Sequence, residues 1–184
     1  MKKVLIIMAD GFEEIEAVTV IDLLRRADID VIIAGLNGKS VTGAHNIVVA
    51  ADIELKSVLK AEYDMLILPG GGPGTAALAA SSDVLELIRR YDSKKTYIAA
   101  ICAAPTALAK AGIMDGRAVT SYPGTENAFD SKLYKTEAVV ISGHIITSRA
   151  PGTAADFALT LVKILAGENR AETLAKEIYH NQRR

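Results

Sequence analysis

Cys102 is the only cysteine in the sequence, and its neighbours resemble those of a reactive thiol. Ala100 and Ala104 stand two residues to either side, and Pro105 suits the first turn of a following helix. Small residues at these two positions are typical of a strained strand-to-helix turn that pushes a nucleophile into a cleft. A helix N-terminus there would also lower the pKa of the thiol. Because free cysteine is often buried and inert, this pattern alone leaves both interpretations open.

A glycine-rich loop, "LPGGGPGTAAL", follows another apolar run, and Gly70, Gly71 and Gly72 let its backbone turn sharply and present N–H groups. The loop could form an oxyanion hole, bind phosphate or be a plain tight turn. Residues 72–77 match the G-x-G-x-x-A dinucleotide fingerprint, which also needs an acidic residue at the end of the next strand. That strand ends at Ile101 and Cys102, so we predict no dinucleotide cofactor.

Three glutamates, Glu13, Glu14 and Glu16, lie at the start of a predicted helix, where the helix dipole alone would favour them. The predicted inward stripe of this helix consists of Ala17, Val20, Leu23, Leu24 and Ala27. Glu13 and Glu16 fall on or beside this stripe, and Glu14 falls toward its margin. A desolvated carboxylate has a raised pKa and suits proton transfer. The spacing does not choose between Glu13 and Glu16.

The elements that would position these residues alternate along the chain, with short apolar runs separated by helical patterns. This order is typical of an α/β fold with a doubly wound parallel sheet, in which ligands bind at the carboxyl ends of the strands. Strands are predicted at 3–8, 30–36, 64–70, 96–101 and 118–122, and helices at 13–27, 75–91 and 104–112. Hairpins are predicted at 41–52 and 138–149, and two helices divided near Gly167 at 152–182.

Composition limits the classes of function. The chain has 184 residues with no linker-like segment, which predicts a single domain over 1–184. Its 21 basic and 22 acidic residues give no footprint for nucleic acid. We expect no secretion signal and no membrane span, and therefore a cytoplasmic protein. One cysteine excludes an internal disulfide, and three histidines far apart in sequence predict no metal site: His45, His144 and His180.

Four segments together resemble the ThiJ/PfpI superfamily, most closely its DJ-one branch: "ADGFEEIEAVTVIDLLRRA", "LPGGGPG", "AAICAAPTAL" and "ITSRAPGTAADFAL". The resemblance runs from Lys3 to about Gly167. It implies a flavodoxin-like three-layer sandwich, a homodimer and a nucleophile elbow at Cys102. It also implies that Glu16 hydrogen-bonds the sulfur, with Glu13 as a secondary candidate. The backbone N–H groups that would face the reactive centre belong to Gly71 and Ala103.

The resemblance implies glutathione-independent conversion of methylglyoxal to lactate, deglycation of proteins, chaperone action or oxidative-stress sensing, with no cofactor. Ala103 replaces the histidine that follows the cysteine in the peptidase-like branch, which argues against a peptidase, and "SGHIITSR" lacks the His-Glu pair of glutamine amidotransferases. Tyr122 replaces a histidine of the human-type branch and is a poor base near neutral pH. The leading hypothesis is a cysteine-dependent glyoxalase or deglycase acting on a small carbonyl compound or glycated protein. The alternatives are a redox-sensing chaperone, whose cysteine oxidises to sulfinate, and a scaffold with a vestigial site.

Overall fold

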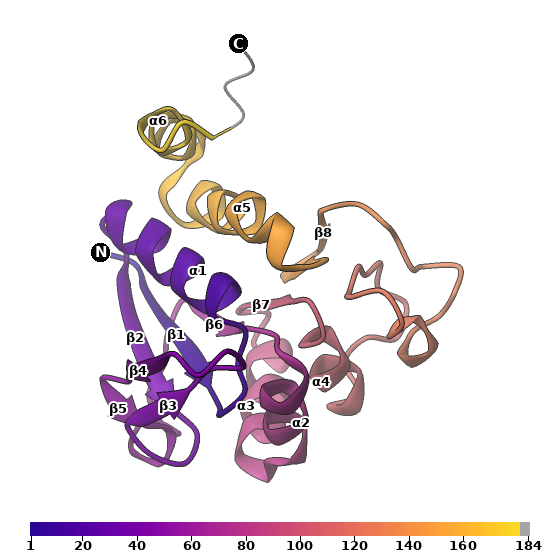
Figure 1. Ribbon diagram of the computed structural model, residues 1–184. Coiled ribbons are helices and arrows are strands. Elements are labelled where there is room, and N and C mark those ends of the chain that lie inside the picture. The colour runs from indigo at the N-terminus through magenta and orange to yellow at the C-terminus, as the bar shows by residue number, and fades with distance from the viewer. Residues whose placement is uncertain (181–184) are drawn as a thin grey trace.

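The computed structural model describes residues 1–180 and is built around a seven-stranded sheet of order β5-β2-β1-β6-β7-β9-β8 (Figure 1). All neighbouring strands are parallel except the last pair. The strands of this sheet are β1 (Lys3–Met8), β2 (Asp30–Gly35), β5 (Ile53–Glu54), β6 (Met65–Leu68), β7 (Tyr97–Ile101), β8 (Val139–Ser142) and β9 (Ile145–Ser148). A doubly wound α/β fold was predicted, and this topology confirms it.

Helices cover both faces of the sheet, as Figure 1 shows. On one face lie α1 (Glu14–Arg26), α5 (Ala154–Ala166) and α6 (Glu168–Glu177), and on the other lie α2 (Gly72–Ala80), α3 (Ser82–Ser93) and α4 (Pro105–Lys110). Short 3₁₀ turns occur at Leu55–Ser57, Glu126–Ala128 and Pro151–Thr153. Strand β1 shows why its sequence is apolar throughout: Ile6 packs in the core under α1, and Leu5 and Ile7 pack in the opposite core.

Both predicted hairpins are present. Strands β3 (Ser40–Thr42) and β4 (Val48–Ala50) pair antiparallel as a separate ribbon, and β8 and β9 pair through a turn in which Gly143 has φ +64°. Gly167 has φ +93° and separates α5 from α6, as expected. The last two residues of the predicted helical segment, 181 and 182, lie outside the described residues.

Two predicted elements differ from the structure. The helical pattern at 75–91 is broken at Ser81, which has an extended backbone and accepts the N–H of Val84 at 3.4 Å as the N-cap of α3. The segment 118–122 is no strand, because only Val119 makes a bridge, to Tyr134, and the N–H of Thr120 bonds the side chain of Thr147 instead of a strand backbone. The apolar pattern there reflects burial in a loop.

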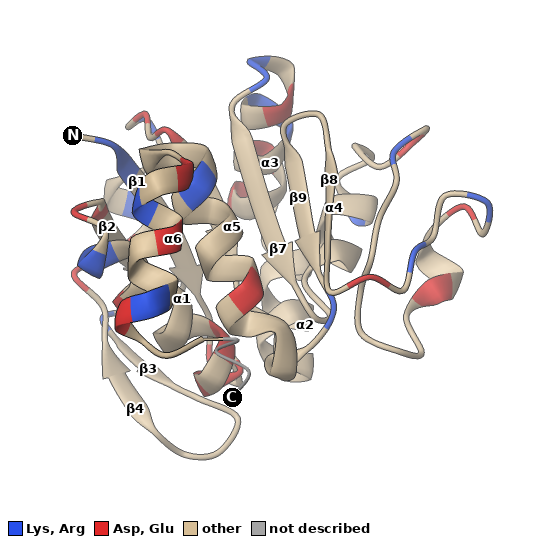
Figure 2. Cartoon of the chain, turned by 90° about the horizontal axis from the view of Figure 1, so that it is seen from above, with Lys and Arg blue, Asp and Glu red and all other residues tan. Residues whose placement is uncertain are grey.

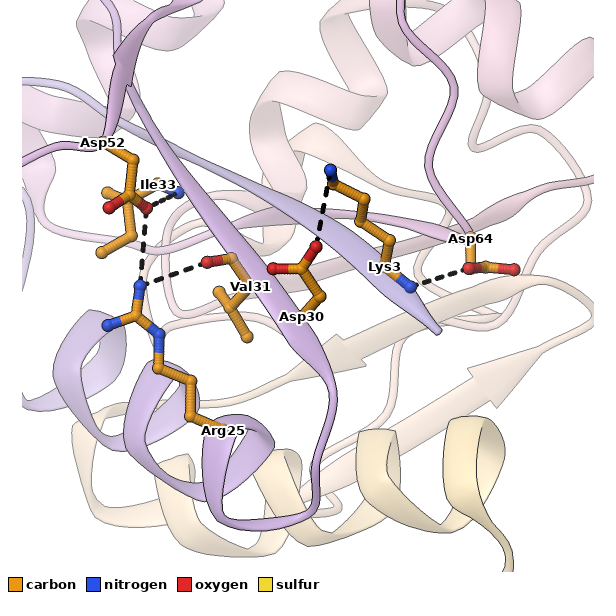
Figure 3. Close-up of polar contacts among 7 residues, drawn as sticks. All are labelled: Lys3, Arg25, Asp30, Val31, Ile33, Asp52 and Asp64. Atoms are coloured by element: carbon orange, nitrogen blue, oxygen red, sulfur yellow. Dashed lines mark hydrogen bonds and ion pairs between the residues drawn. The ribbon is translucent and has the colours of Figure 1, made fainter. Parts of the chain in front are cut away.

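Polar contacts tie the first strands and α1 together (Figure 3). Asp52 accepts the N–H of Ile33 at 2.8 Å and the guanidinium of Arg25 at 3.4 Å, which links the end of α1 to β2. Asp64 accepts the N–H of Lys3 at 2.8 Å and so fixes the start of β1. These contacts, with the packing of α1 on α5, hold α1 in place beside the sheet.

Charged residues of both signs are interspersed over the helices, whereas the β3–β4 hairpin carries none (Figure 2). No helix within residues 1–180 has the length and apolar content needed to cross a bilayer.

Candidate active site

Cys102 lies at a sharp turn directly after β7. Its φ of +64° is in the left-handed region, which costs a residue other than glycine roughly 1–3 kcal/mol and must be held by its surroundings. The Cys102 N–H donates to the carbonyl of Ser148 at 2.9 Å, and its carbonyl accepts the N–H of Tyr122 at 2.7 Å. Pro105 begins α4, and the cysteine is only 7% exposed. The predicted strand-to-helix elbow is therefore confirmed in its backbone geometry.

The glycine loop lies against this elbow, and two of its residues have no room for a side chain. A Cβ on Gly70 would lie 2.4 Å from Glu16 Oε2 and 2.6 Å from Cys102 Cβ. Gly71 has φ +92°, and a Cβ there would lie 2.3 Å from the carbonyl oxygen of Gly11. The backbone N–H groups of Gly71 and Ala103 act on the sulfur to lower the pKa of Cys102, against the larger effect of burial. The loop thus lies against the thiol, and its use as an oxyanion hole stays a prediction.

Glu16 projects from α1 into the same place and is fully buried. Its Oε2 accepts the N–H of Gly70 at 2.8 Å, and its carboxyl group also contacts the thiol of Cys102. Burial raises the pKa of Glu16 to about 7, against the opposing effect of those two contacts. Its Oε1 is buried without a conventional hydrogen-bond partner among the described residues.

The thiol and the carboxyl group influence each other. Burial, followed by the charge of the Glu16 carboxylate and its hydrogen bond to the thiol, raises the pKa of Cys102 to about 12. The two effects of Glu16 require an ionised carboxylate. When Glu16 is protonated these two effects are removed, and the N–H groups of Gly71 and Ala103 then act to lower the pKa of the thiol against burial alone. With a pKa of about 12 for Cys102 and about 7 for Glu16, a single proton shared by the pair lies on the sulfur, beside a carboxylate that can accept it when the thiol reacts.

Glu13 does not reach the sulfur. Its backbone N–H donates to the carbonyl of Gly70 at 3.0 Å, and its carboxylate lies 3.8 Å from Nδ1 of His45. Helical spacing could not choose between the two glutamates. In the structure the carboxyl group of Glu16 contacts the thiol, whereas that of Glu13 lies near the imidazole of His45. The charge of Glu13 still acts on Glu16, whose pKa it helps to raise.

Glu14 is buried, whereas its helical position predicted the margin of the apolar stripe. The reason is the hairpin, which covers it: Oε1 accepts the N–H groups of His45 at 2.6 Å and Ile47 at 3.5 Å, and Oε2 lies 2.8 Å from His45 Nδ1. Burial alone would raise the pKa of Glu14, but these hydrogen bonds lower it to about 2. Glu14 therefore joins the hairpin to α1, a role that no sequence pattern indicated.

Tyr122 is bound to the elbow by its backbone only. Its N–H donates to Cys102, but its side chain is 47% exposed and its hydroxyl makes no hydrogen bond within residues 1–180. Ser148 was not predicted to belong to the site, yet its carbonyl accepts the Cys102 N–H from the neighbouring strand. That contact follows from the register of β7 and β9, which pairs Ile101 with Ser148.

Comparisons with known proteins identify the family of the chain. Residues 2–164 match the model of the DJ-1/PfpI family. The chain is 42% identical over 178 residues to Protein dj-1beta of Drosophila melanogaster, covering 95% of each chain. It is 35% identical over 167 residues to glutathione-independent glyoxalase DJR-1.2 of Caenorhabditis elegans, covering 90% of this chain and 89% of that one. The solved structure of oxidized Toxoplasma gondii DJ-1 superposes with a TM-score of 0.95 at 32% identity, covering 98% of this chain and all of the other. The chain belongs to the DJ-1/PfpI family.

Proposed function

We propose that this protein is a glutathione-independent glyoxalase or protein deglycase, acting through Cys102 on small 2-oxoaldehydes or early glycation adducts. The observation that carries the proposal is the contact between the buried Glu16 carboxyl group and the thiol of Cys102, on which the N–H groups of Gly71 and Ala103 also act. The 35% identity to the nematode protein named as a glutathione-independent glyoxalase supports the same chemistry.

In the first step, the Cys102 thiolate attacks the aldehyde carbon of methylglyoxal. A C–S bond forms while the C=O π electrons move to oxygen, giving a hemithioacetal oxyanion that then takes a proton. We assign the stabilisation of this oxyanion to the N–H groups of Gly71 and Ala103, and their effect on the pKa of the thiol supports that assignment. Protonated Glu16 is the neighbouring acid, so its proton is available to the oxyanion.

In the second step, ionised Glu16 removes the hydrogen of the former aldehyde carbon as a proton and returns it to the neighbouring carbon. The former aldehyde carbon is thereby oxidised to a thioester and the former ketone carbon is reduced to an alcohol, so no external oxidant is needed. Water then cleaves the thioester, releasing lactate and the free thiol. A carboxyl group with a pKa of about 7 suits this exchange near neutral pH.

The test is D/L-resolved measurement of lactate from methylglyoxal, without glutathione and in amine-free buffer, for the native protein and Cys102→Ala. We expect many turnovers for the native protein and only background for the variant. Because Cys102 sits in a fixed turn, circular dichroism must show that the variant is folded. Equal lactate from the two folded proteins would refute the proposed mechanism.

A second candidate function is redox sensing, in which peroxide oxidises Cys102 to sulfinate and thereby changes a chaperone or partner surface. The buried Glu16 favours it, because a protonated carboxyl group could donate a hydrogen bond to a sulfinate oxygen, and the similar Toxoplasma gondii structure is of an oxidized protein. Intact mass after mild peroxide treatment should show the rapid gain of two oxygen atoms. Oxidation no faster than that of free cysteine would argue against sensing.

We also propose a homodimer. Large apolar side chains are exposed on α1 and on the uncharged hairpin beside it: Ile15, Val18, Ile47 and Val48. The N–H of Ile47 reaches Glu14, so these two elements are in contact. Light scattering after size exclusion should give twice the chain mass, and Val18→Asp together with Val48→Asp should give the monomer. A native protein that elutes with the mass of one chain would refute the dimer.

A further inference from the structure

One group of side chains outside the thiol site brings together three atoms that could bind a metal ion. Oxygens of Glu13 and Glu14 and Nδ1 of His45 all lie within 4.8 Å of one another. The two glutamates come from the start of α1, whereas His45 comes from the hairpin between β3 and β4. We call these three residues the Glu–Glu–His cluster. The hairpin brings the imidazole to the carboxylates over a separation of 31 residues.

The cluster is largely fixed before any ion binds. Glu14 uses Oε1 to accept the N–H groups of His45 and Ile47, so Oε2 is held facing the imidazole. Hydrogen bonds of this kind orient the ligands of established metal sites. The residue therefore presents one oxygen in a set direction.

The surroundings of Glu13 support a bound cation independently of the Glu14–His45 hydrogen bond. Its side chain is only 14% exposed, yet its carboxylate accepts no hydrogen bond from any residue in the described range. Its nearest cationic group is Nδ1 of His45 at 3.8 Å, which is too far for a hydrogen bond. Neither of its oxygens is among the fully buried atoms without a partner, so water can reach this carboxylate, and a cation between it and Glu14 would take the place of that water.

We propose that the Glu–Glu–His cluster binds one divalent transition-metal ion of the zinc type. Ligand atoms around four-coordinate zinc lie about 3.3 Å apart, from bond lengths of about 2.0–2.1 Å, and the separations from Nδ1 here are 2.8 Å and 3.8 Å. The imidazole selects zinc, nickel or copper over magnesium and calcium. Its lone pair coordinates the ion after Nδ1 gives up its proton to solvent. In the single chain the His45 side chain is 68% exposed, so an ion can enter there from solvent and keep water in its remaining positions.

This proposal departs from the sequence-based prediction of no metal site, which rested on the wide spacing of the histidines. It does not rest on the proposed reaction, because no residue of the cluster is assigned a part in the chemistry at Cys102.

The experiment is calorimetric titration of zinc chloride into the Cys102→Ala protein, a background that removes the thiol as a competing ligand. We expect one ion per chain. His45→Asn and Glu13→Gln, each made in that background, should weaken binding about tenfold or more, as loss of even a supporting residue commonly does. His144→Gln is the matched control, because His144 bonds Asp92 and lies outside the cluster; it should bind zinc like the parent.

Thermal denaturation gives a second measurement and shows whether each variant is folded. Zinc should raise the melting temperature of the Cys102→Ala protein and leave that of the His45→Asn variant unchanged. No saturable binding to the folded parent would overturn the proposal, and so would binding that survives both His45→Asn and Glu13→Gln.

Discussion

Replacing Glu16 by glutamine should remove a specific part of the pH dependence of stability. Burial raises the pKa of Glu16 from 4.5 to about 7, so the folded protein binds the proton more tightly than the unfolded chain. The resulting stabilisation is fully present below pH 4.5 and is lost as the pH rises through about 7. At about 1.4 kcal/mol for each unit of pKa, the total loss is about 3 kcal/mol.

The assay is urea denaturation of the native protein and Glu16→Gln at pH values between 4 and about 8.5, a window that spans both pKa values. Subtracting the two free energies of unfolding removes groups common to both proteins, including His45, whose pKa is raised by its hydrogen bond to Glu14. The difference should change by about 3 kcal/mol in favour of the variant as the pH rises. A difference that stays constant across this range would refute the reasoning that Glu16 is protonated because it is buried.

Further predictions concern the surroundings of the thiol. Gly70→Ala would place a methyl group 2.4 Å from Glu16 Oε2; we expect a destabilisation of about 1–3 kcal/mol in urea and a loss of lactate production. Gly72→Ala, whose methyl group meets nothing within 4 Å, should change neither, and equal effects of the two would contradict this account. Tyr122→Phe should keep lactate turnover within about threefold, well short of the hundredfold or more that an acid–base catalyst contributes; a larger loss would give its hydroxyl a part in the reaction. Glu14→Gln should be less stable than the native protein above pH 4.5, and this disadvantage should shrink in acid unfolding experiments as the pH falls through about 2; a disadvantage that stayed constant down to pH 2 would show that the carboxylate charge is not what holds the hairpin.

The sequence predicted those parts of the fold that depend on local pattern. Strand β1 was predicted with its observed bounds because both of its faces are covered, which makes its apolar run continuous. The elbow at Cys102 was predictable because small residues and Pro105 flank it. The local pattern gave a wrong prediction at Ser81. The apolar residues on its two sides fit one helical period, so a single helix was predicted where Ser81 caps the start of a second one.

The parts that could not be predicted depend on contacts between distant segments. Helical spacing placed Glu14 at the margin of the stripe, and its burial arises from a hairpin about thirty residues away. The choice between Glu13 and Glu16 required the glycine loop, whose Gly70 N–H binds only the latter. The hairpin likewise brings His45 close to the carboxylates of Glu13 and Glu14. The spacing of the histidines along the sequence could not predict this contact.

The central claim is that Glu16 is the acid–base partner of Cys102, and its neighbour in sequence supplies the control. Lactate formation from methylglyoxal should be measured at pH 7 for folded Glu16→Gln and Glu13→Gln under identical conditions. We predict that kcat/KM falls by about 10²–10⁴ for Glu16→Gln, the usual contribution of a general acid–base catalyst, and that Glu13→Gln retains most of the native value. Full turnover by Glu16→Gln, or its loss in Glu13→Gln alone, would contradict the account.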